Sequence, residues 1–390
     1  MSKAIVLTDR VKFLHSEMKE WMDYMHANPE LSMEEYSTAG FIAEKLTSWG
    51  YTVVDKVGKH GVVASLTVGD GKKSIGLRAD FDALPIQEEN NLSYKSTKNG
   101  VAHLCGHDAH TTMLLGAAKY LAENRNFNGT VRLIFQPAEE TMQGAKAMIE
   151  DGLWERFPVD TIYAMHNMPG FELGKFYFRE GETMAAVDNW EIVLTGKGSH
   201  GSTPELGVDP IVCGASSVMA LQTIVSRNVS PWNNCVVNVG SFQSGQAGNA
   251  VPQRAILRVS IRNMDKDIRK LVLKRIRTIV KTQSESFNCE YEIIEGIAGS
   301  VLVNTLENTQ WSAKVATNIF GEENVVYGMQ QFMGSEDFAF MLEDKPGSYC
   351  MIGNGESQML HHPGYIFNQD LLPIGAGYWV GLVQEYLTIS

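Results

Sequence analysis

Residues 130–140 read TVRLIFQPAEE and join an apolar run directly to two carboxylates. The first six residues have the length and the β-branched content of a buried strand. Helical periodicity precedes this strand at 111–124, and a second helix is expected to follow it at 138–150. Strands that alternate with helices predict a mainly parallel sheet with helices on both faces. Ligand sites in such sheets lie beyond the carboxyl ends of the strands, which is where Glu139 and Glu140 stand.

The same alternation extends through the first half of the chain. It predicts helices and strands at 14–26, 36–49, 61–68, 74–79 and 161–165, the first two being helices. Residues 1–16 lack the apolar run behind a basic start that marks a signal peptide, and they are expected to belong to a helix. No segment reaches the roughly 18–20 apolar residues of a membrane span, so no membrane partner is expected.

The pattern changes near residue 185. Strands are predicted at 190–195, 235–242, 254–262 and 289–294, with helices at 210–226 and 266–286. Their order, β-α-β-β-α-β, is that of a ferredoxin-like unit. We therefore expect one catalytic domain formed by residues 1–184 and 299–390. It is interrupted by a smaller inserted α+β domain at 185–298.

The composition narrows the function classes. The 390 residues include 33 basic and 45 acidic side chains, which gives a formal net charge of -12. This balance argues against a nucleic-acid-binding surface, which usually has basic clusters. The five cysteines are odd in number and scattered, which favours a reducing, cytoplasmic setting over a disulfide scaffold.

Residues 103–110, HLCGHDAH, form the densest cluster of reactive side chains. Cys105 and His107 are two residues apart, and Gly106 between them allows an unusual backbone conformation, so both side chains can face one metal ion. A thiolate beside an imidazole suits zinc or a similar ion. Asp108 or His110 could orient a ligand. The alternative is a polar loop before a helix, with Asp108 as its cap.

Three further strand ends carry polar side chains. Glu139 and Glu140 leave their strand in different directions, so one can bind a metal while the other acts as a general base; the alternative is an acidic first turn of a helix. His166 follows the strand at 161–165, where a lone histidine is more often structural. After the strand at 74–79, Asp80 could support a ligand imidazole and Arg78 could pair with Asp82, or the three could form a plain salt-bridged turn.

Further candidate site residues lie later in the chain, in both predicted domains. One histidine of the sequence His361-His362-Pro363 is a plausible ligand from the C-terminal part of the chain. In the inserted domain, His200 lies in a glycine-rich loop after a strand, and this loop lacks the residue order of a phosphate-binding loop. Asn249 lies in a second flexible loop, and Arg262 ends the next strand.

Taken together, these segments resemble the M20 family of metallopeptidases and amidohydrolases. The similarity runs from NPELS at 28–32 to HHP at 361–363, and the runs CGHDAH at 105–110 and QPAEE at 136–140 resemble its branch of hippurate hydrolases, N-acyl-amino-acid amidohydrolases and auxin-conjugate hydrolases. Met168 and Phe81 depart from the usual tryptophan and methionine, so the acyl pocket can differ.

The resemblance implies roles for individual residues. It implies the metal ligands Cys105, His107, Glu140, His166 and His361, the last preferred over its neighbour because the family's ligand lies two residues before the proline. Glu139 resembles the general base, and Asp80 a partner that supports a ligand. His200 resembles a histidine that stabilises the oxyanion in the other subunit's site, and Asn249 and Arg262 resemble residues that bind the substrate.

The implied enzyme holds two divalent metal ions per subunit (Zn, Mn, Co or Ni) in the catalytic domain and hydrolyses N-acyl amino acids as a homodimer or a dimer of dimers. The resemblance implies that the inserted domain at 185–298 is a lid and dimerisation domain. Dipeptidase, carboxypeptidase, auxin-conjugate hydrolase and N-acetyl-diaminopimelate hydrolase activities remain alternatives on the same scaffold. A metal-free hydrolase with Cys105 as the nucleophile would explain the cysteine but not the carboxylates and the distal His361. The third class is a metal-stabilised binding protein without activity.

Overall fold

The computed structural model describes residues 11–389. Most of the helix expected over 1–16 therefore lies outside the described residues. The chain separates into two compact units. The larger comprises the chain up to Gly181, Val303–Gln330 and the chain from Asp337; the smaller comprises Glu182–Leu302 and Gln331–Glu336. Two short strands, β7 (Gly181–Met184) and β14 (Leu302–Asn304), span the division.

The larger unit contains an eight-stranded sheet in the order β1-β2-β4-β3-β5-β16-β6-β15. Its strands are β1 (Thr52–Val57), β2 (Gly61–Val68), β3 (Ser74–Asp80), β4 (Gly129–Gln136), β5 (Thr161–Met168), β6 (Phe176–Phe178), β15 (Val325–Tyr327) and β16 (Gly347–Gly353). The central neighbours β4, β3, β5 and β16 are parallel, whereas β1 and β2 are antiparallel to their neighbours. Every residue of β5 and β16 is buried, as is typical of parallel strands covered on both faces.

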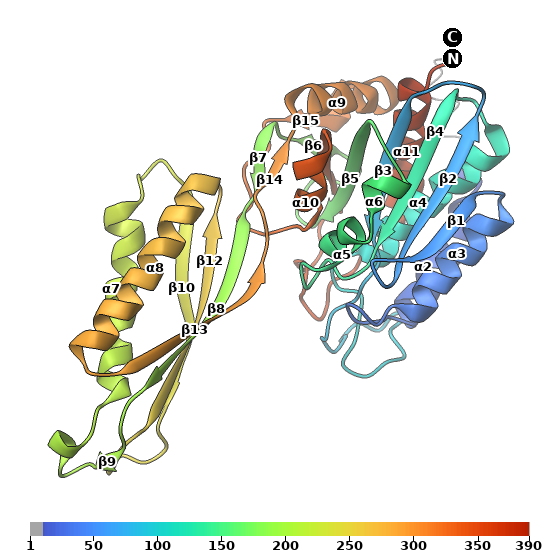
Figure 1. Cartoon of the computed structure of the whole chain (residues 1–390). Helices are drawn as coiled ribbons and strands as arrows, with labels where there is room; N and C mark the ends of the chain where they lie inside the picture. The colour runs from blue at the N-terminus through green and yellow to red at the C-terminus, as the bar shows by residue number, and fades with distance from the viewer. Residues whose placement is uncertain (1–10, 390) are drawn as a thin grey trace. The chain divides into compact units, whose positions relative to one another are not determined.

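Helices cover both faces of this sheet. They are α2 (His15–Ala27), α3 (Tyr36–Ser48), α4 (His107–Asn124), α5 (Gly144–Glu150), α6 (Leu153–Arg156), α9 (Leu306–Phe320), α10 (Phe338–Asp344) and α11 (Leu372–Tyr386). In Figure 1, α5, α6 and α10 lie in front of the sheet, while α4 and α11 lie behind it. The predicted fold class, a mainly parallel sheet with helices on both faces, is confirmed.

The smaller unit has its own four-stranded antiparallel sheet and its own core. The order along the chain is β8 (Ala186–Thr195), α7 (Pro210–Asn228), β10 (Cys235–Ser244), β12 (Arg254–Asn263), α8 (Lys266–Ser286) and β13 (Glu290–Ala298). The strand order β10-β12-β8-β13 is that of the ferredoxin-like fold predicted from the sequence. Short strands β9 (Ser199–His200) and β11 (Ala250–Val251) pair beyond this sheet.

Two predicted helix boundaries are wrong, and both lie at the site. The helix expected from residue 138 begins only at Gly144, because Ala138 and Met142 have φ values of +51° and +57° that interrupt helical geometry. The helix expected from residue 111 already begins at His107. Among the described residues, no helix is both long and apolar enough to cross a membrane.

Candidate active site

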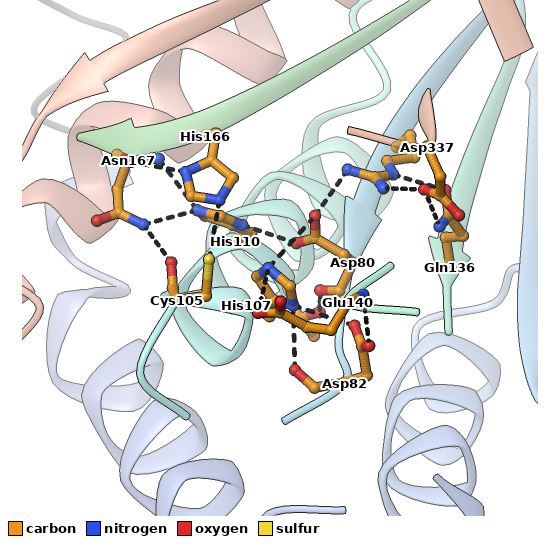
Figure 2. A network of polar contacts seen from close by, with 12 residues as sticks. Asp80, Asp82, Cys105, His107, His110, Gln136, Glu140, His166, Asn167 and Asp337 are labelled. Atoms are coloured by element: carbon orange, nitrogen blue, oxygen red, sulfur yellow. Dashed lines mark hydrogen bonds and ion pairs between the residues drawn. The ribbon is translucent and has the colours of Figure 1, made fainter. Parts of the chain in front are cut away.

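The five side chains proposed as metal ligands come together in the larger unit from four separate segments. The donor atoms form two groups, and within each group all atoms lie within 4.8 Å of one another. One group comes from Cys105, His107 and His166, and the other comes from Cys105, Glu140 and His361. Cys105 belongs to both groups. Figure 2 shows its thiol below the imidazole of His166 and beside that of His107. A single sulfur between two sets of donors is an arrangement that can serve two cations.

The individual distances are those of a site that a cation would complete. Cys105 Sγ lies 3.4 Å from His166 Nε2, and His361 Nε2 lies 3.4 Å from Glu140 Oε1. His107 Nε2 lies 3.9 Å from the same Glu140 oxygen. The ring of His107 is fully buried, whereas the His361 side chain is 50% exposed. The donor cluster is therefore enclosed on the sheet side and reaches solvent at His361.

Hydrogen bonds aim the imidazole lone pairs into the cluster. Nδ1 of His107 lies 3.0 Å from the carbonyl oxygen of Asp82 and 3.1 Å from its carboxylate, so it carries the proton and leaves Nε2 as an acceptor. Nδ1 of His166 likewise donates to the Asn167 carbonyl at 2.6 Å. His107 Nε2 and Glu140 Oε1 are buried without a hydrogen-bond partner. Facing acceptors of this kind fit a divalent metal ion.

The protonation tendencies differ from one donor to another. Burial, reinforced by the neighbouring His110, holds the pKa of His166 well below 6.5, which favours the neutral, metal-binding form. Burial opposes a charged His107, but Asp80 and Cys105 outweigh it and raise the pKa of that imidazole. Burial raises the pKa of the Cys105 thiol. The raised pKa of His107 means that its neighbours Asp80 and Cys105 favour a positive charge at this position in the cluster.

Glu139 and Glu140 lie in a turn after β4 and not in the first turn of a helix. Carboxylate oxygens of both lie within 4.8 Å of a His107 nitrogen and of each other. The Glu140 N–H donates to the Asp82 carboxylate at 3.0 Å, which fixes the turn. Glu139 is buried but is outside the two groups that share Cys105.

Glycine is required between Cys105 and His107. Gly106 has a φ of +93°, and a Cβ atom there would lie 2.3 Å from the Asn167 side-chain nitrogen. That nitrogen donates to the Cys105 carbonyl at 2.7 Å. The left-handed Gly106 turns the chain sharply into α4, so that the side chains of Cys105 and His107 face the same donor cluster.

Arg78 pairs with Asp80 and not with Asp82, contrary to the sequence prediction. The Nη1–Oδ2 distance is 2.7 Å, because residues two apart on β3 point to the same face, whereas Asp82 lies beyond the strand end. The other Asp80 oxygen lies 2.7 Å from His110 Nδ1, and Oδ2 lies 3.9 Å from His107 Nε2. The buried Arg78 and Asp80 therefore form a charged support at the end of β3.

The sequence did not identify Asp82 and Asn167 as supporting residues. Asp82 orients His107, and Asn167 donates to His110 Nε2 through its backbone at 3.1 Å. Tyr365 donates to the Asn167 side-chain oxygen at 2.6 Å. The only sequence signal was their position directly beside predicted site residues.

The two neighbouring histidines of the C-terminal loop have different surroundings. His361 has a φ of +67°, and its backbone N–H donates to the Leu104 carbonyl at 2.8 Å, next to Cys105. His362 accepts the Gly364 N–H at Nδ1, at 3.0 Å, within its own turn. The structure thus brings His361 to the donor cluster.

The remaining candidates belong to the smaller unit. His200 and Asn249 lie together, because β9 pairs with β11 with His200 opposite Ala250, and the Gly201 N–H donates to the Asn249 carbonyl at 2.8 Å. Both side chains are exposed. Arg262 lies at the opposite end of β12, where its Nη1 donates to Ser335 Oγ at 2.8 Å.

Comparison with known proteins extends over nearly the whole chain. Residues 76–385 match peptidase family M20/M25/M40. The hippurate hydrolase of Campylobacter jejuni is 45% identical, over 96% of this chain and 97% of its own length. The N-acetyl-L-cysteine deacetylase of Bacillus subtilis is 35% identical, over 92% and 85%. The crystal structure of a Bacillus subtilis protein described as a dinuclear metal-binding peptidase from the M20 family superposes with a TM-score of 0.82 at 30% identity, covering 96% of this chain and 99% of that chain.

Proposed function

The chain belongs to peptidase family M20/M25/M40, and we propose that its buried donor cluster holds two divalent metal ions with which it hydrolyses the amide bond of N-acyl amino acids. The enzyme is a metal-dependent amidohydrolase that releases a carboxylic acid and a free amino acid. The observation that carries this proposal is the pair of donor groups that share Cys105. Relatives named for hydrolysing hippurate and deacetylating N-acetyl-L-cysteine support the substrate class.

The chain's own residues divide the work of hydrolysis. When bound, a pair of divalent ions polarises the amide carbonyl and acidifies the attacking water. In this proposal Cys105, His107, Glu140, His166 and His361 hold the ions. Glu139, close to His107 and Glu140 but outside the shared donor groups, accepts the proton of the water and delivers it to the leaving nitrogen.

We further propose that the enzyme is a cytoplasmic homodimer in which His200 stabilises the oxyanion in the partner's site. Nδ1 of His200 accepts the Ser202 N–H at 3.2 Å and lies 2.7 Å from Ser202 Oγ, which can donate to the same nitrogen; with Nδ1 as the acceptor, Nε2 carries the ring proton. The exposed ring therefore offers an N–H donor, the group that an oxyanion needs. Asn249 and Arg262 are proposed to bind the amide and the carboxylate of the substrate.

Mixed dimers test the role of His200. His200→Ala and Glu139→Gln homodimers are each expected to be inactive, while a mixture exchanged between them regains activity, because one site per mixed dimer has both residues. The measurement is turnover by purified mixed dimers carrying two different affinity tags. Full activity of the His200→Ala homodimer would remove this residue from the mechanism, and inactive mixed dimers would place His200 in its own subunit's site.

Removal of metal tests the proposed function itself. Dialysis against a chelator is expected to abolish hydrolysis of N-benzoylglycine and N-acetyl amino acids, and Mn²⁺, Co²⁺, Ni²⁺ or Zn²⁺ is expected to restore it. The panel varies the acyl and amine parts separately and includes dipeptides, auxin conjugates and N-acetyl-diaminopimelate. Activity that survives complete metal removal would favour a thiol hydrolase, and no activity with any metal would favour a binding protein.

A further inference from the structure

The segment 30–35, between α2 and α3, touches the active-site turn and the support of His107. Its backbone joins the end of β3 through the Ala83 N–H, which donates to the Glu30 carbonyl at 2.9 Å. Ser32 Oγ donates to the Asp82 carboxylate at 2.7 Å. Glu35 Oε1 accepts the Ala138 N–H at 2.9 Å. One short segment therefore contacts two parts of the site that are far from it in sequence.

Glu35 is an unusual residue for a buried position. Its side chain is fully buried, and its second oxygen, Oε2, has no hydrogen-bond partner. Burial, together with the nearby Asp82 carboxylate, raises the pKa of Glu35 to about 7. A buried carboxyl with an unsatisfied oxygen lowers stability, so its presence calls for a compensating role. Its Oε1 accepts a hydrogen bond from the backbone of the active-site turn.

The hydrogen bond to Glu35 is donated by Ala138, the residue directly before Glu139 and Glu140. Ala138 has the left-handed φ of +51°, which a residue with a Cβ atom adopts at a cost. Its carbonyl accepts the N–H groups of Gln143 and Gly144, which closes the turn. The orientation of the Ala138 peptide therefore sets the direction in which Glu139 and Glu140 leave β4.

We propose that Glu35 is a positioning residue, whose Oε1 holds the Ala138 amide so that Glu139 and Glu140 face the donor cluster. Ser32 is proposed to position Asp82 in the same way, through the hydrogen bond of its hydroxyl to the Asp82 carboxylate. Asp82 in turn contacts His107 Nδ1 and accepts the Glu140 N–H. This inference rests on the proposed function in that it takes Glu139 as the base and Glu140 as a ligand.

Two substitutions separate the position of the acceptor oxygen from the charge of Glu35. Glu35→Gln keeps the chain length and an acceptor oxygen but removes the charge. Glu35→Asp keeps the charge but withdraws the oxygen by one methylene. Glu34→Ala, at the exposed neighbour, is the matched control. The readouts are kcat and KM on N-benzoylglycine, affinity for Co²⁺ in competition with a chromophoric chelator, and urea unfolding.

Glu35→Asp is expected to lower kcat and weaken Co²⁺ binding by about 10–100-fold, the usual effect of losing a support behind a metal site, whereas Glu35→Gln retains most of both. Wild-type values for Glu35→Asp, or a greater loss for Glu35→Gln than for Glu35→Asp, would overturn the inference. If Glu35→Asp unfolds, Ser32→Ala, which deletes only a hydroxyl, must lower Co²⁺ affinity or the inference fails. Because Co²⁺ binding is measured without substrate, an inactive wild-type enzyme would count against the proposed function and not against the role of Glu35.

Discussion

Glu139→Gln is expected to lower kcat by about 10²–10⁴-fold while the protein keeps both metal ions. The amide has nearly the shape of the carboxylate but cannot accept the proton of the attacking water. Because Glu139 lies outside the two donor groups that share Cys105, its replacement leaves every proposed ligand in place. The measurement combines kcat on N-benzoylglycine with the metal content of the same preparation.

The adjacent Glu140→Gln is the matched control for this substitution. Glu140 shares a donor group with Cys105 and His361, so its variant is expected to lose metal as well as activity. The two variants differ by one position in the chain and make the same chemical change. Loss of metal by Glu139→Gln with residual activity would move Glu139 to the ligands, and metal retention by Glu140→Gln would remove Glu140 from them.

Four of the five proposed donors stand at places that the periodicity of the sequence identifies, whereas the complete set, with His361, is what the resemblance to the M20 family implied. Glu140 follows β4, His166 is near the end of β5, and the Cys105–His107 pair flanks a glycine at the start of α4. The carboxyl ends of parallel strands meet at one edge of a sheet, so side chains there converge even when the strands are far apart in sequence. Periodicity predicts the strands, and their parallel arrangement predicts that a site lies at their carboxyl ends.

The residues that hold the donors could not be predicted in the same way. Glu35 and Ala138 are 103 positions apart, and their hydrogen bond depends on how two irregular segments meet. The helix predicted from residue 138 was wrong for a related reason. Helical propensity is a local property, whereas the left-handed Ala138 is held by a tertiary contact from Glu35. Conformations that depend on distant contacts carry no periodic signal.

The ion pair at the end of β3 is another feature that local sequence patterns did not predict correctly. The sequence suggested a pair between Arg78 and Asp82, which are four residues apart. Side chains two residues apart on a strand point to the same face, so Asp80 pairs with Arg78. Asp82 lies beyond the strand end and orients His107 instead. The exact end of a strand decides which of two aspartates faces the guanidinium, and strand ends are the least certain part of a sequence-based assignment.

Cys105→Ala is expected to remove both metal ions and to abolish hydrolysis. Its sulfur is the only donor that the two groups among the described residues share, so one substitution weakens both sites. The loss of metal affinity should exceed the roughly 10–100-fold that follows the loss of a supporting hydrogen bond. Equilibrium dialysis with Co²⁺ measures the affinity, and the thiolate-to-cobalt absorption of the wild type should disappear. Cys235→Ala, in the smaller unit, is the control and should keep both metals. A Cys105→Ala protein that is inactive but fully loaded with metal would instead make this thiol a nucleophile, since a nucleophile can be deleted without emptying the site.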